Sequence, residues 1–81
     1  MANEKEGFVQ ENELLINLLL HHAPNVVPLG VITSYLDASV NGVQSVVVRA
    51  RGALKQKDHP LHGKAEIVTM NRVGYRLVLK E

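Results

Sequence analysis

Residues 66–80 read EIVTMNRVGYRLVLK, and this stretch decides the fold at the C-terminal end of the chain. Apolar and β-branched side chains alternate with polar ones over residues 66–70 and again over 73–80, which is typical of strands with one face against a core. Asn71 and Arg72 lie between the two runs and predict a hairpin with a two-residue tip. Asn tolerates the positive φ of such tips, whereas Arg is less usual than Gly at the second position. Because a lone hairpin is barely stable in water, its apolar face is expected to pack on other elements.

Gly74 and Tyr75 within the hairpin have a structural explanation. Glycine in a strand lets another backbone or a bulky ring approach closely. Tyr75 is expected to pack onto a helix with its hydroxyl near water, so we assign it to the core.

Upstream of the hairpin, apolar residues recur at three- and four-residue spacings that predict amphipathic helices. Asn12 is placed as the N-cap of the first helix, Pro24 ends it, and Pro28 opens the second. Val26 and Val27 lie between two prolines, which predicts a short extended piece. The first two helices are expected at residues 12–22 and 28–37.

Asn41 and Gln44 predict a capping box that opens a third helix. A run of valines at 46–48 favours a strand instead, since β-branched residues lose rotamer freedom in a helix, and Gly52 costs about 1 kcal/mol relative to Ala. The cap and the helical spacing decide for the helix, and the polar, turn-rich residues 57–64 are expected to form a loop. The expected buried face of the helix holds Val43, Val47, Ala50 and Leu54.

The expected class is therefore α+β, with three helices followed by a two-stranded ribbon. Eighty-one residues are too few for a second core. We expect a loose leader over residues 1–11 and one domain over 12–81. The longest apolar run is far below the roughly 18 residues of a membrane span, and the start of the chain lacks an apolar signal segment, so a cytoplasmic location without membrane contact is expected.

Composition excludes several classes of chemistry. The absence of cysteine removes disulfides, thiolate zinc sites and thiol nucleophiles. No nucleophile-base arrangement, paired carboxylates or phosphate-binding glycine loop is present, so neither an enzyme nor a cofactor is expected. Two histidine pairs, His21-His22 and His59 with His62, suggest zinc, but adjacent histidines point in different directions and no carboxylate has suitable spacing, so no metal is expected.

The net charge of +1 gives little support to nucleic-acid binding by itself. The distribution is more informative, because Lys5 is the only one of the nine Lys and Arg residues that precedes residue 48. Acidic residues instead crowd the start of the chain. The second half is therefore the positive half.

Residues 67–77, IVTMNRVGYRL, resemble the wing of the DNA-binding domain of OmpR/PhoB-type response regulators, commonly written I-x-T-V-R-G-V-G-Y-R-L. Residues 43–54, VQSVVVRARGAL, resemble the recognition helix of that family, V-D-V-H-I-S-R-L-R-R-K-L. The similarity covers about residues 12–79 in the family's order. It implies a winged helix-turn-helix whose third helix enters the major groove of double-stranded DNA, while the hairpin wing contacts the backbone or minor groove.

The chain departs from the family pattern at several positions. Val46 and Val48 stand where the family often has His and a polar or basic residue, and Gly52 and Ala53 replace basic residues, which predicts a less charged DNA face. Arg72 replaces the wing-tip glycine. Only about a dozen residues precede the first helix, so a free-standing domain without a receiver domain or phosphorylation switch is expected.

The face opposite the buried one supplies the expected DNA contacts. Arg49 matches an arginine of the family that reads bases or grips phosphates, and a bidentate contact with guanine is worth about 1 to 3 kcal/mol of discrimination. Gln44 is suited to contact adenine, although it is also the capping-box partner, and Val48 is suited to contact a thymine methyl group. The alternative is that the helix residues form an ordinary solvated face and that Asn71 and Arg72 form an ordinary polar turn. Phosphate contacts are expected from Arg51 and Lys55. The complete expected set is Gln44, Ser45, Val48, Arg49, Arg51, Lys55, Asn71 and Arg72.

The sequence thus predicts a DNA-binding transcription regulator that acts as a homodimer or binds in tandem on adjacent half-sites. The alternative is a winged helix that binds RNA polymerase, another regulator or a nucleoid protein without sequence-specific DNA binding. The valine-rich third helix and the near-neutral charge favour this alternative. A purely structural oligomer is a third possibility.

Overall fold

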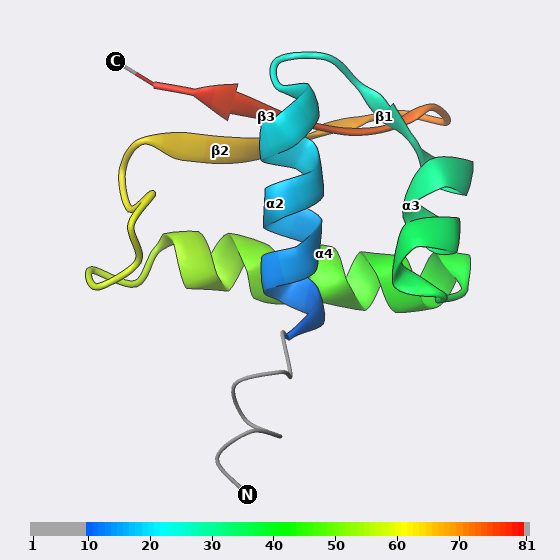
Figure 1. The fold of residues 1–81 in the computed structure, drawn as a ribbon, viewed down its shortest axis with the longest axis horizontal. Helices are drawn as coiled ribbons and strands as arrows, with labels where there is room; N and C mark the ends of the chain where they lie inside the picture. Colours follow the sequence, from blue (N-terminus) through cyan, green and yellow to red (C-terminus); the bar gives the residue numbers. More distant parts are fainter. Residues whose placement is uncertain (1–9, 81) are drawn as a thin grey trace, which may run out of the picture.

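Three helices and a three-stranded antiparallel sheet make up residues 10–80, the part of the chain that the computed structural model describes (Figure 1). The expected α+β class is confirmed. Each helix lies within one or two residues of its predicted position. The elements are α2 (Glu11–His22), β1 (Val27–Pro28), α3 (Leu29–Leu36), α4 (Val40–Leu54), β2 (Ala65–Met70) and β3 (Gly74–Leu79).

The predicted helix caps are wrong in both places. Ser39, not Asn41, is the N-cap of α4: its backbone is extended and its hydroxyl oxygen accepts the N–H of Gly42 at 3.1 Å. Asn41 and Gln44 therefore lie inside the helix, and Gln44 is not a capping partner. Gln10 takes the N-cap position of α2 instead of Asn12, with an extended backbone and no side-chain bond.

The sheet has the strand order β1-β3-β2, so the expected two-stranded ribbon gains a third strand. The extended piece predicted between the two prolines pairs with β3, where Val27 lies opposite Tyr75 and Pro28 opposite Gly74. A Cβ atom at Gly74 would overlap the carbonyl group of Val27. The predicted close approach at this glycine is confirmed, and the neighbour is the backbone of β1.

The hairpin forms, but its tip has three residues, 71–73, because Met70 lies opposite Gly74; the predicted two-residue tip is wrong. The N–H of Val73 donates to the carbonyl of Met70 at 3.0 Å. The positive φ falls on Arg72, at 64°, rather than on Asn71. Arg72 thus adopts the left-handed backbone that a glycine would take without strain. The carbonyl of Val73 accepts the N–H of Leu29 at 2.9 Å, which holds the hairpin tip against the start of α3.

The core lies between the three helices and the inner face of the sheet, with α2 crossing α4 and the sheet (Figure 1). The four residues predicted to form the buried face of α4 are all buried, and Val46 joins them at 1% exposure. The resemblance counted Val46 towards the DNA face, but the structure buries it in the core. Tyr75 is half-buried against this cluster, so it lies at the margin of the core.

Residues 55–64 connect α4 to β2 as an irregular segment, consistent with the predicted loop. The ring of His59 fixes this segment to α2, because Nε2 lies 3.2 Å from Oε2 of Glu13. Its other nitrogen, Nδ1, accepts the N–H of Leu61 at 3.0 Å. This histidine therefore packs the loop onto the first helix.

Among the described residues, no helix combines the length and the apolar character that crossing a membrane requires.

Candidate nucleic-acid interface

The outer face of α4 carries most of the residues predicted to contact DNA. Because side chains three or four positions apart share a helix face, burying one stripe of α4 leaves the opposite stripe exposed. Val48 is 68% exposed and is among the most exposed large apolar side chains of the described region. The exposed residues on this stripe are Gln44, Ser45, Val48, Arg49 and Lys55.

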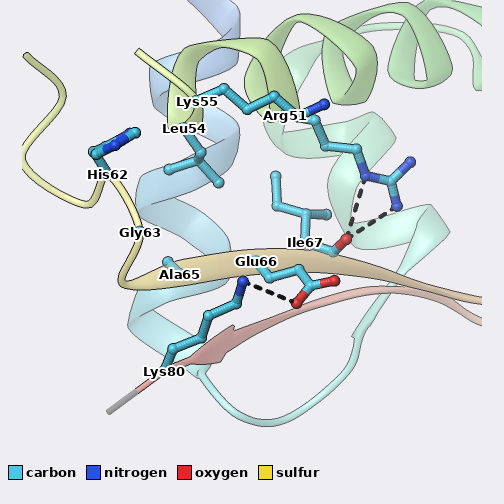
Figure 2. A pocket seen from close by; sticks show the side chains of 9 residues that line it. All are labelled: Arg51, Leu54, Lys55, His62, Gly63, Ala65, Glu66, Ile67 and Lys80. Carbon is cyan, nitrogen blue, oxygen red and sulfur yellow. Dashed lines mark hydrogen bonds and ion pairs between the residues drawn. The ribbon is translucent and has the colours of Figure 1, made fainter. Parts of the chain in front are cut away.

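Arg51 does not point freely outward but binds the hairpin. Its Nε and Nη2 atoms donate to the carbonyl oxygen of Ile67 at 3.3 and 3.0 Å, and Nη2 also donates to Oγ1 of Thr69 at 2.9 Å (Figure 2 draws the contacts with Ile67). The guanidinium group therefore occupies part of the open edge of β2, where unpaired backbone groups would otherwise meet solvent. Arg51 joins α4 to the hairpin and holds its positive charge between them.

Arg49 lies on the other flank of the helix, towards α2. Its Nη2 is 3.4 Å from Oε1 of Glu11, and the two side chains are 59% and 48% exposed. An ion pair this exposed is worth at most about 1 kcal/mol. The arginine can therefore leave Glu11 for another anion at low cost.

The centre of the exposed face, between these two arginines, is uncharged. Asn41, Ser45, Val48 and Gly52 line it, and all are exposed. Small neutral side chains allow close contact with a partner surface. Basic groups at the flanks of such a strip can reach phosphates or the base edges nearest to them, while the strip itself can contact base edges.

Asn71 and Arg72 are exposed at the hairpin tip. The tip is held beside α3, at the opposite end of β2 from the loop that follows α4 (Figure 1). The predicted residues therefore form two groups, one on α4 and one at the tip. Arg51, bound to β2, lies between them.

An open pocket of about 370 Å³ lies where α4 ends and β2 begins (Figure 2). Its buried side chains are Leu54, Ala65 and Ile67. Arg51, Lys55, His62, Glu66 and Lys80 surround them. The sequence patterns did not predict that His62 and Lys80 line this pocket. A loop separates His62 from α4, and the whole hairpin separates Lys80 from it.

The two histidine pairs have ordinary positions. His21 and His22 contact each other edge to face, with ring centroids 6.2 Å apart, and His59 is bound to Glu13 and Leu61. Within residues 10–80, no group of three His, Asp or Glu side chains has the geometry to hold a metal ion.

Comparison with known proteins adds no relative, since no family model, curated protein or solved structure matches this chain. The resemblance to OmpR/PhoB-type domains stays a prediction from the two motifs.

Proposed function

We propose that this protein is a winged-helix DNA-binding domain that regulates transcription, with α4 in the major groove and the β2–β3 hairpin as its wing. The observation that carries the proposal is the exposed face of α4 beside a hairpin with a basic tip. A major groove about 12 Å wide admits one α-helix. The uncharged strip with basic flanks suits base edges bordered by phosphates.

The connection between α3 and α4 supports a helix-turn-helix. Residues 37–39 link the two helices, and Asp37 adopts a left-handed backbone with φ 53°. Its N–H donates to the carbonyl of Ser34, and that of Ala38 donates to Thr33, so α3 ends sharply. A short turn of this kind is what places a second helix across the first in DNA-binding motifs.

Six of the exposed residues receive a role under this proposal. Gln44 and Arg49 contact bases, with Arg49 exchanging Glu11 for guanine, and Val48 meets a thymine methyl group. Lys55 contacts a phosphate, and the hairpin tip with Asn71 and Arg72 contacts the adjacent backbone or minor groove. One module makes few contacts, so the affinity is modest and the chain acts as a homodimer or in tandem on adjacent half-sites.

The test is a salt titration of the full chain with duplex DNA, followed by fluorescence anisotropy, together with selection of preferred sites from a random pool. Binding at about 50 mM salt that weakens steeply as salt rises is the expected result. Arg49→Ala is expected to relax or abolish the sequence preference without unfolding the protein. Absence of binding at about 50 mM salt would overturn the proposal.

A second candidate is a winged helix that binds a protein such as RNA polymerase or another regulator. The observation that favours it is the exposure of apolar side chains on α3, where Val31 is 46% and Tyr35 50% exposed. Val31 and Tyr35 are four residues apart and so lie on one side of the helix. If Tyr35→Ala abolishes transcription regulation in cells while the affinity for DNA is unchanged, a protein is the primary partner.

A further inference from the structure

We propose that the pocket between the end of α4 and the start of β2 is a second seat for a DNA backbone phosphate, remote from the wing tip. This inference rests on the proposed DNA-binding function and names where the duplex is held. The pocket has about 370 Å³ of space, enough for a small organic group, and it is open to solvent. Its buried part is apolar and its border is basic.

The charge around the pocket favours an anion. Arg51, Lys55 and Lys80 carry permanent positive charges, and Glu66 is the only carboxylate among the lining residues. The carbonyl end of α4 adds roughly half a negative charge. Three permanent cations exceed these two opposing contributions, so the pocket is net positive.

The three basic side chains differ in whether a carboxylate is paired with them. Arg51 donates only to uncharged oxygens, those of Ile67 and Thr69, so no carboxylate within residues 10–80 neutralises it. Lys80 Nζ is 3.5 Å from Oε1 of Glu66, with both side chains more than half exposed, and such a pair holds weakly. Lys55 forms no ion pair within the described residues.

The position of Lys80 is set by the backbone. Its N–H donates to the carbonyl of Lys64 at 2.6 Å, which holds the end of β3 against the start of β2. Lys80 therefore lies across the pocket from Lys55 although it is near the end of the chain (Figure 2). A phosphate in the pocket would have basic side chains on the helix side, from Arg51 and Lys55, and on the hairpin side, from Lys80.

The apolar side chains explain why this is a pocket and not only a basic patch. Leu54, Ala65 and Ile67 are each less than one tenth exposed, and they form a surface without hydrogen-bonding side chains. A deoxyribose ring next to the phosphate can pack on such a surface, while the charged oxygens stay at the border. The arrangement thus fits one sugar-phosphate unit better than a free inorganic ion.

The spacing along the hairpin places this seat relative to the wing tip. β2 has six residues, which span about 20 Å at roughly 3.4 Å per residue. The pocket is at the start of β2 and Arg72 is just beyond its end. Since the major groove is about 12 Å wide, basic groups about 20 Å apart can reach the two strands that border the groove holding α4.

The pocket also lies on the correct side of the helix. Figure 2 shows its side chains in front of α2, on the side of α4 that faces the hairpin. Lys55 belongs to the exposed stripe that includes Gln44 and Val48. A duplex contacting that stripe would therefore pass the mouth of the pocket.

The experiment measures how the affinity for a random duplex of about two helical turns changes with salt concentration, for the full chain and its variants. Each phosphate contact contributes about 0.9 to the slope of log K against log salt. Lys55→Gln, compared with the parent, is expected to lower that slope by about 0.9 and to weaken binding on the order of tenfold at 50 mM salt, equally on all sequences. The double variant Lys80→Gln with Glu66→Gln is expected to show the same loss compared with Glu66→Gln alone.

Controls separate this seat from general charge effects. Lys57→Gln removes an exposed lysine of the neighbouring loop that does not line the pocket, and the slope is expected to stay unchanged. Glu66→Gln alone is expected to strengthen binding, and it is also the reference for the Lys80 pair. The substituted side chains are exposed, so unchanged thermal unfolding shows that the fold is intact.

The outcomes distinguish the two proposals. If Lys55→Gln binds with the slope of the parent and the Lys80 pair with the slope of Glu66→Gln, while an Arg72 variant lowers the slope, DNA binding stands and the second seat is refuted. If Lys57→Gln lowers the slope as much as Lys55→Gln, the effect is unspecific and the seat is also refuted. If the parent protein does not bind DNA at about 50 mM salt, the proposed function itself has failed.

Discussion

The bridge from Arg51 to the hairpin leads to a prediction about stability. Replacing Arg51 with Met keeps an unbranched apolar stem over the half-buried site and removes the guanidinium group. The variant loses three hydrogen-bond contacts to the carbonyl of Ile67 and the hydroxyl of Thr69. The perturbation is therefore limited to the contacts between α4 and β2.

The size of the effect follows from those contacts. Hydrogen bonds to charged groups contribute about 1.5 to 3 kcal/mol where they are shielded. Because Arg51 is only half-buried and water can replace it at the strand edge, we expect Arg51→Met to lower the free energy of unfolding by about 1 to 2 kcal/mol. For a domain of this size, that corresponds to a fall in Tm of roughly 4 to 16 °C.

Urea unfolding followed by circular dichroism measures the loss directly, and an unchanged m-value shows that the same surface is exposed. Arg49→Met is the matched control on the same helix. Its ion pair with Glu11 is exposed, so a change within about 0.5 kcal/mol is expected. If Arg51→Met is as stable as Arg49→Met, the bridge does not hold the hairpin, and the reasoning is refuted.

Three further predictions follow from the backbone. Gly74→Ala is expected to cost more than about 3 kcal/mol or to prevent folding, because its Cβ would overlap β1; a normal melting curve would contradict the observed pairing of β1 with β3. Arg72→Gly removes a side chain from a left-handed backbone position, so it is expected to raise the free energy of unfolding by up to about 1 kcal/mol. It is also expected to lower the salt slope of DNA binding by about 0.9. A less stable variant would mean that Arg72 does not adopt the positive φ of this turn. Ser39→Ala is expected to cost about 1 kcal/mol, and Asn41→Ala almost nothing, in chemical unfolding; the reverse order would place the cap at Asn41.

The helices were predictable because their apolar residues recur over two or more turns. The N-cap residues of these helices were not predictable. Ser39 and Asn41 are both good N-cap residues, and a side-chain preference of about 1 kcal/mol does not select between positions two residues apart. The burial of Val46 could have been deduced, since it lies three residues after Val43 and four before Ala50 on the same side of the helix.

The third strand was only partly predictable. β1 has two residues, which is too short for any alternation to be recognised. The indirect sign was Gly74, since a glycine in a strand suggests that another backbone lies close by. The sequence gives no means of telling which backbone that is, and the pairing with Val27 comes from the fold.

The candidate site was predictable where it follows helical spacing and not where it depends on distant contacts. Gln44, Val48 and Lys55 lie on the exposed face of α4 as expected. The bond from Arg51 to Ile67 spans 16 residues and the contact between His59 and Glu13 spans 46. Such contacts depend on the relative placement of whole elements, which local patterns do not encode.

The most direct test of the account is an amide-resolved NMR titration of the full chain with a short random duplex at about 50 mM salt. Saturable shifts are expected on the exposed positions of α4, centred on Val48, and at Arg72 on the hairpin tip, with small changes in the core. An unchanged spectrum, or shifts confined to the outer side of α3 at Val31 and Tyr35, would contradict it.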